Sequence, residues 1–81
     1  MNGLLPTSEV LKRLCIGRTM LYEWIKQELM TPSIPLTKKT VVWPESEVQA
    51  VIDSIIAGDS PQVRRAMIKS LIASRSRLRA A

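Results

Sequence analysis

The sequence contains no histidine and only one cysteine, Cys15, so the usual side chains of nucleophilic and metal chemistry are scarce. A lone cysteine cannot form an internal disulfide, and without histidine it lacks a base to activate it as a nucleophile. The sequence also has no glycine-rich phosphate loop and no metal-ligand cluster. We therefore expect no enzyme, no cofactor and no metal, and we interpret Cys15 as a small apolar turn residue of an intracellular protein.

Long apolar runs are missing as well. No apolar stretch reaches the roughly 18 residues of a membrane-spanning helix, and the N-terminus lacks the basic and apolar regions of a signal peptide. We therefore expect no membrane partner. The 81 residues, 46% of them hydrophobic, are enough for one small domain with a thin core.

Acidic residues are nearly absent from the end of the chain. Up to Ala57, six basic residues balance six acidic ones, whereas the six basic residues after it are accompanied by Asp59 alone. The whole net charge of +5 therefore lies in the C-terminal segment. A basic segment on a neutral body suggests a polyanionic partner, and the alternative is a solvated helix whose arginines keep the protein soluble.

The first third of the chain predicts two short helices joined by a tight turn. Thr7 or Ser8 can cap a first helix that ends near Leu14, and Gly17 supplies conformational freedom at the turn. A second helix is expected over about residues 18–27. Two helices with a turn of this length form a helix-turn-helix unit, whose second helix is suited to a DNA major groove.

The second helix is predicted to have two different faces. At about 100° per residue, its apolar side consists of Met20, Leu21, Trp24 and Ile25. Its polar side consists of Arg18, Thr19, Tyr22, Glu23 and Lys26. Because the apolar side must pack on the first helix, the polar side should remain free to contact bases and phosphates. The alternative is an ordinary amphipathic surface helix.

Residues 30–43 predict a basic hairpin, or wing. Two prolines exclude a continuous helix, and residues 40–43 favour a strand. The polar tip carries Lys38 and Lys39, which would contact the DNA backbone beside the second helix. The alternative is a solvated hairpin tip.

Two more helices follow. The third should open at Pro44, end at Gly58 and bury one face, made of Val48, Val51, Ile52, Ile55 and Ile56. Ser60 should cap a fourth helix over about residues 61–79, whose apolar face is interrupted by Arg64 and Arg75. That face either folds back on the core or pairs with a second copy of the chain, and the sequence leaves both open.

Several short motifs, in a fixed order, carry a family resemblance. They are Leu4-Leu5-Pro6-Thr7, Glu9-Val10-Leu11, Gly17-Arg18-Thr19-Met20-Leu21-Tyr22 and Trp43 with Glu45-Ser46-Glu47-Val48. With them the chain resembles the AlpA family of phage transcriptional regulators and, more broadly, the excisionase and MerR-type winged-helix group. The resemblance implies a mainly α fold with a small β-hairpin: a winged helix-turn-helix over residues 1–57. Residues 58–81 extend beyond the shared pattern, and their own sequence predicts an extra basic amphipathic helix there.

The resemblance also implies a function. It indicates a sequence-specific double-stranded DNA-binding protein of a phage or other mobile element, in the bacterial cytoplasm and nucleoid. Such a protein acts as a transcription regulator, or as an excisionase, a recombination directionality factor that bends attachment-site DNA for an integrase. Carried over residue by residue, Arg18, Thr19 and Tyr22 would face DNA, with Lys39 at the wing.

The chain departs from the family pattern at three places. Gly17 replaces a serine, so a capping and phosphate-binding hydroxyl is lost. Glu23 stands where a base is frequent, and it would either repel phosphate or accept a hydrogen bond from a cytosine amino group. The wing tip lacks the paired glycines. Further candidate phosphate contacts are Gly17, Arg64, Arg65 and Lys69.

A second hypothesis makes the fourth helix the working part. The chain would then be a protein-interaction or oligomerisation module with weak, nonspecific DNA binding. Its partner would be an integrase, RNA polymerase or another copy of itself. Cooperative assembly of several copies on DNA is compatible with both hypotheses, because a monomer of this size covers few base pairs.

Overall fold

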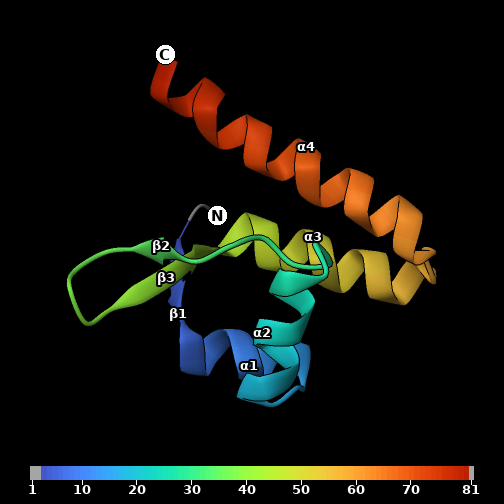
Figure 1. The fold of residues 1–81 in the computed structure, drawn as a ribbon, viewed down its shortest axis with the longest axis horizontal. Coiled ribbons are helices and arrows are strands. Elements are labelled where there is room, and N and C mark those ends of the chain that lie inside the picture. The colour runs from blue at the N-terminus through green and yellow to red at the C-terminus, as the bar shows by residue number, and fades with distance from the viewer. Residues whose placement is uncertain (1–2, 81) are drawn as a thin grey trace.

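Seven elements of secondary structure follow one another in the structure, a computed structural model that describes residues 3–80, with side chains up to Arg75. They are β1 (Leu4–Pro6), α1 (Thr7–Leu14), α2 (Arg18–Lys26), β2 (Ile34–Pro35), β3 (Val41–Pro44), α3 (Glu45–Ala57) and α4 (Pro61–Ala80). In Figure 1, α1 and α2 lie on one side of α3, α4 lies on the other, and β2 and β3 project as a wing. The fold is thus a winged helix-turn-helix with an added C-terminal helix, as predicted.

The sheet has three short antiparallel strands in the order β1-β3-β2. Leu5 lies opposite Trp43, and Ile34 lies opposite Val42. The strand β1 was not predicted from the sequence. Three residues carry no recognisable strand pattern by themselves, and β1 forms by pairing with β3, which lies far along the chain.

Trp43 is the centre of the core. Its side chain is fully buried, and its indole Nε1 donates a hydrogen bond to the carbonyl oxygen of Thr31 at 3.0 Å. The other buried hydrophobic residues of this cluster come from β1, from all four helices and from the segment after α2: Leu5, Val10, Leu14, Leu21, Met30, Val48, Val51 and Ile68. A single core therefore joins the helix-turn-helix, the sheet and α4.

The turn between α1 and α2 differs from its prediction. The left-handed residue is Cys15, with φ 57°, whereas Gly17 has φ −86° and an extended backbone that any residue can adopt. The backbone conformation at position 17 therefore does not require a glycine. The predicted caps at Thr7 and Ser8 are also wrong, because Pro6 occupies the N-cap position and leads directly from β1 into α1.

Some apolar residues predicted to be buried are exposed. Met20 keeps 48% of its surface, Ile55 40% and Ile56 78%. On α2, Leu21 is the residue that reaches the core fully, so the buried stripe is narrower than the pattern suggested. On α3 the buried face runs through Glu47, Val48, Val51 and Ser54, and the last turn extends past the core to the connection with α4.

The connection to α4 follows its prediction. Gly58 ends α3 in the left-handed conformation, with φ 72°, and the Ser60 hydroxyl accepts a hydrogen bond from the Val63 amide at 3.3 Å. The helix then folds back and buries Ile68, with Met67 and Leu71 partly buried beside it (Figure 1). Within residues 3–80, no helix is both long enough and apolar enough to cross a membrane.

The buried hydroxyl of Thr31 gives a first prediction. Among the described residues its Oγ1 has no hydrogen-bond partner, although the residue is fully buried. Thr31→Val keeps the shape and removes the lone polar group, so we expect the free energy of unfolding to rise by about 1 kcal/mol. Urea unfolding should show a higher midpoint with an unchanged m-value. A lower midpoint would contradict this and show that the hydroxyl is hydrogen-bonded in solution.

Candidate nucleic-acid interface

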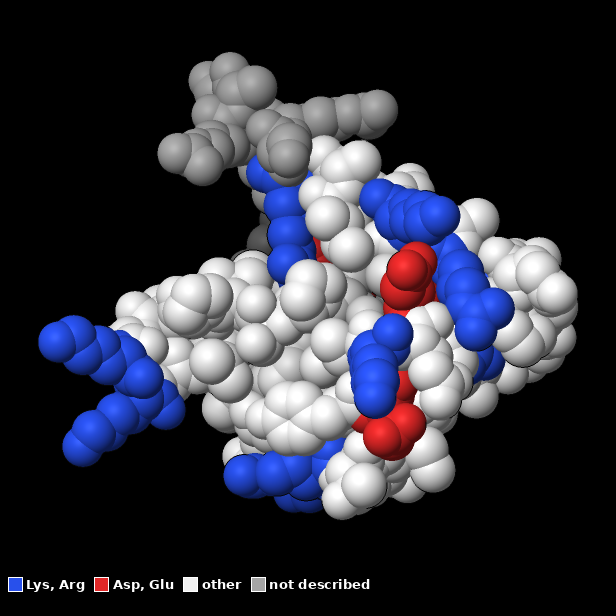
Figure 2. Space-filling view, in the orientation of Figure 1, with Lys and Arg blue, Asp and Glu red and all other residues white. Residues whose placement is uncertain are grey.

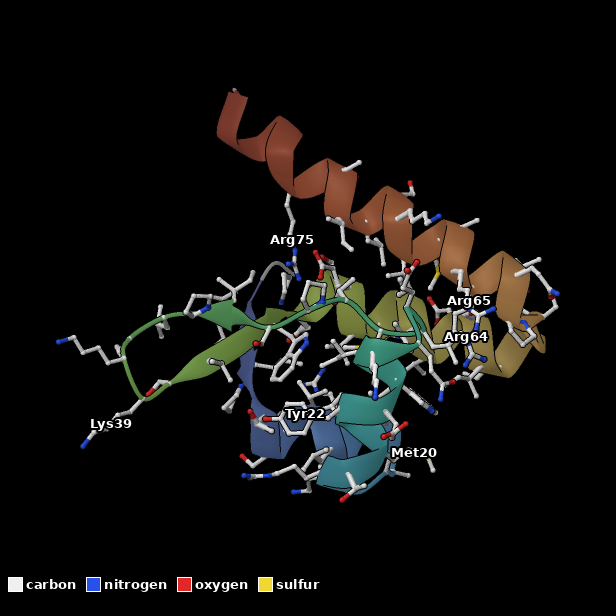
Figure 3. The ribbon with its side chains drawn as sticks, viewed as in Figure 1. Met20, Tyr22, Lys39, Arg64, Arg65 and Arg75 are labelled. Carbon is white, nitrogen blue, oxygen red and sulfur yellow. The ribbon has the colours of Figure 1, made fainter. Side chains whose placement is uncertain are left out.

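The polar face of α2 lies open at the surface. All five residues predicted for it are exposed: Arg18, Thr19, Tyr22, Glu23 and Lys26. The rotation of the helix about its axis is fixed from the opposite side, because Leu21 is fully buried and Trp24 and Ile25 are partly buried. Tyr22 keeps 49% of its surface and projects from α2 on the side where the wing extends (Figure 3). α4 lies on the opposite side of α3 from α2 (Figure 1).

The start of α2 is electrostatically positive. Gly17 is its N-cap and offers no side chain, and the first turn contains Arg18 but no acidic residue. The free amides of a helix N-terminus carry a partial positive charge, so this end favours an anion. A Cβ at Gly17 would meet nothing within 4 Å, so the family's serine would fit here.

The wing is closed by a threonine instead of glycine. Thr37 Oγ1 accepts hydrogen bonds from the amides of Lys39 and Thr40, at 3.3 Å and 3.1 Å. The amides of Leu36 and Thr37 donate to the Thr40 carbonyl oxygen. These bonds define the tip, which lacks the paired glycines. Thr37 was predicted only to lie in the polar tip and not to close it, although hydroxyl residues commonly stabilise turns in this way.

Lys38 and Lys39 are both exposed at the tip. Figure 2 shows basic side chains at the far end of the wing, and Lys39 is labelled there in Figure 3. The same view of Figure 2 shows basic and acidic side chains interspersed over the opposite half of the molecule. In this view, no acidic side chain lies beside the basic ones at the tip of the wing.

Two of the further candidate phosphate contacts hold α4 against the body. The Arg64 guanidinium lies 5.7 Å from the Trp24 ring centroid, and its Nε is 3.4 Å from Ser54 Oγ. Arg65 Nε donates to the Gln27 carbonyl oxygen at 3.0 Å. Trp24 belongs to the apolar side of α2, so Arg64 does not join the polar face around Tyr22. Lys69 is exposed on α4.

An ion pair that the sequence analysis missed joins α4 to α3. Arg75 donates through Nε to Glu47 Oε2 at 2.8 Å and through its NH2 group to Glu47 Oε1 and to the Pro32 carbonyl oxygen. The Glu47 side chain is 6% exposed, and that of Arg75 is 22% exposed. Glu47 lies in the first turn of α3, where an acidic residue is common without any partner on another helix. The one sequence signal was the interruption of the apolar face by Arg75.

Cys15 is exposed, and its thiol lies 3.7 Å from the Lys12 carbonyl oxygen. Over the described part of the chain, no three histidine, cysteine or acidic residues gather where they could hold a metal ion.

Comparison with known families gives one match. The model of a family described as the prophage CP4-57 regulatory protein (AlpA) matches residues 3–56. The match runs from the residue before β1 to the last turn of α3 and does not include α4. Searches of curated proteins and of solved structures gave no match.

Proposed function

Because the chain belongs to the AlpA family of prophage regulatory proteins, whose model covers about two thirds of it, we propose that it regulates by binding double-stranded DNA sequence-specifically. In this proposal α2 enters the major groove and the wing contacts the neighbouring backbone. The observation that supports it most is the uncovered polar face of α2, whose orientation is fixed by the buried Leu21 behind it.

The side chains on this face suit different contacts. Arg18, in the first turn of α2, can donate two parallel hydrogen bonds to a guanine edge, and Thr19 can bond to either a base or a phosphate. Tyr22 offers a ring and a hydroxyl at the middle of the face. Glu23 can accept from a cytosine amino group. The lysines Lys26, Lys38 and Lys39 would neutralise phosphates on either side.

Residues 1–57 would form the DNA-binding unit, and residues 58–81 a helix that supports it. The burial of Ile68 in the core favours this arrangement over an α4 that acts as a free interaction module. Regulation of transcription and direction of recombination are both open to a protein of this kind. In either role, several copies would bind neighbouring sites, and an integrase or RNA polymerase would be the protein partner.

Selection of duplexes from a random pool tests the proposal. We expect one enriched motif, with an affinity at least about 10³ times that for a scrambled duplex of equal length. A gel-shift series with the motif at different positions in a fragment would measure bending, which the recombination role requires. Binding to all duplexes alike would contradict the proposal and favour the interaction-module hypothesis.

A further inference from the structure

The helix α4 contacts both ends of the segment that joins α2 to the wing. Residues 27–33 form this link between α2 and β2. At its start, the Gln27 carbonyl oxygen accepts a hydrogen bond from Arg65 at 3.0 Å; near its end, the Pro32 carbonyl oxygen accepts one from Arg75 at 3.0 Å. The two arginines are ten residues apart on α4, which corresponds to about 15 Å along a straight helix.

From these contacts we propose that α4 fixes the orientation of α2 relative to the wing. Arg65 and Arg75 are then positioning residues for sequence-specific DNA binding, and they act without touching DNA themselves. This inference rests on the proposed function. Because α4 lies outside the family match, this positioning role belongs to a helix that the family model does not cover.

The first attachment is at the C-terminal end of α2. The last carbonyl groups of a helix lack partners within the helix and carry partial negative charge, so a guanidinium there satisfies both needs. Arg64 adds a second hold by lying over Trp24 and against Ser54, whose hydroxyl in turn donates to Asp59 Oδ2 at 3.0 Å. Figure 3 shows Arg64 and Arg65 together where α4 passes the end of α2.

The second attachment depends on hydrogen bonds more than on packing. A hollow of about 680 Å³ lies between α4 and the sheet, and its lining includes Leu4, Ile34, Glu47 and Arg75. Figure 1 shows α4 diverging from α3 toward its C-terminal end. The Arg75 side chain extends from α4 across this hollow to Glu47 and to the Pro32 carbonyl oxygen (Figure 3). Its bonds therefore hold the second half of α4 in place.

The link between these attachments begins with the turn that closes α2. Glu28 is left-handed, with φ 62°, and the amides of Glu28 and Leu29 donate to the carbonyl oxygens of Ile25 and Trp24. These local bonds fix the start of the link, and the two arginines of α4 hold it at Gln27 and at Pro32. A link held at both ends keeps α2 and the wing at one mutual angle. DNA recognition requires this angle, because helix and wing must reach the groove and the backbone together.

Arg65→Ala tests the first attachment, with Lys12→Ala as the control. Both variants remove one positive charge, but Lys12 is exposed on α1 and belongs to neither attachment. We expect Arg65→Ala to lose roughly tenfold in affinity for the enriched duplex, the typical worth of a hydrogen bond to a charged group. Affinity for a scrambled duplex and the salt dependence should stay as in the wild type. Lys12→Ala should change neither affinity.

The opposite result identifies Arg65 as a phosphate contact. In that case both duplexes would bind more weakly, and the salt slope would fall by about 0.9. That outcome would overturn the proposal that Arg65 acts by positioning α2. A wild-type protein with no preferred duplex would instead refute the proposed function, so the two failures are distinguishable.

The double variant Glu47→Leu with Arg75→Met tests the second attachment. It replaces the ion pair by apolar side chains, a change that often preserves stability, and it removes the donor to Pro32. We expect a thermal midpoint near that of the wild type and a roughly tenfold loss that is confined to the enriched duplex. A folded double variant with the wild-type ratio of specific to nonspecific affinity would overturn the proposal.

Discussion

Arg75→Ala is expected to lower the free energy of unfolding by about 3 kcal/mol, the lower end of what breaking a buried ion pair costs. The substitution leaves the Glu47 carboxylate, with its 6% exposed side chain, without a compensating charge. It also removes the donor to the Pro32 carbonyl oxygen. The lower end applies because the Arg75 side chain retains 22% exposure, which allows water to screen part of the interaction. Urea unfolding followed by circular dichroism measures this loss.

An exposed ion pair on α1 provides the comparison. Arg13 and Glu9 are one turn apart, and Arg13 Nε lies 3.2 Å from Glu9 Oε1. Their side chains are 36% and 39% exposed. We expect Glu9→Ala to cost less than about 0.5 kcal/mol, as is usual for surface pairs of this spacing. Similar costs for Arg75→Ala and Glu9→Ala would show that the Glu47 pair is hydrated in solution and would contradict its structural role.

Arg18→Ala is expected to weaken binding to the enriched duplex by roughly ten- to a hundredfold, the range for one good contact to a base. Arg18 is exposed in the first turn of α2, where the N-terminal residues of a recognition helix contact base edges. Lys12→Ala removes the same charge from the exposed side of α1 and should change the affinity little. Gel-shift titration of both variants against the enriched and scrambled duplexes gives the comparison.

The loss at Arg18 should be larger on the enriched duplex than on the scrambled one, because base contacts carry sequence information and phosphate contacts do not. Thermal unfolding should be nearly unchanged in both variants, since neither side chain is buried. Equal and small losses for Arg18→Ala and Lys12→Ala would remove Arg18 from the interface and refute the placement of α2 in the groove.

The parts of the fold that were predictable from sequence are those with local signals. The helical period placed α2 and α3 within a residue or two, Gly58 ended α3, and Ser60 capped α4. The exposed polar side of α2 also followed from its period, because the apolar residues that must pack lie opposite. The wing was recognisable from its prolines and β-branched residues around a basic tip.

Features that depend on distant parts of the chain were not predictable. β1 exists through pairing with β3, nearly forty residues later. The burial of Glu47 depends on Arg75, which the fold brings across from another helix. The left-handed Cys15 gave no signal either, because glycine two positions later was the obvious candidate. Ile55 and Ile56 follow the buried period, but the core ends before they do.

The residues of the candidate site also fall into a group with local sequence signals and a group that depends on distant parts of the chain. The residues of α2 and the wing could be proposed from sequence because each lies within one amphipathic element. The attachments of α4 could not, since a basic helix gives no indication of which arginine meets a carbonyl oxygen and which faces solvent. Arg64 and Arg65 were grouped with Lys69 by charge, whereas the structure separates them by their contacts.

Tyr22 is the only tyrosine of the chain, and it offers the most direct test of whether the exposed face of α2 meets DNA. Protein with isotope-labelled tyrosine rings gives a single set of aromatic signals, which can be followed while duplex is added. We expect these signals to shift strongly with the enriched duplex and weakly with a scrambled duplex of equal length. Ring signals that stay unchanged at saturation with the enriched duplex would contradict the account.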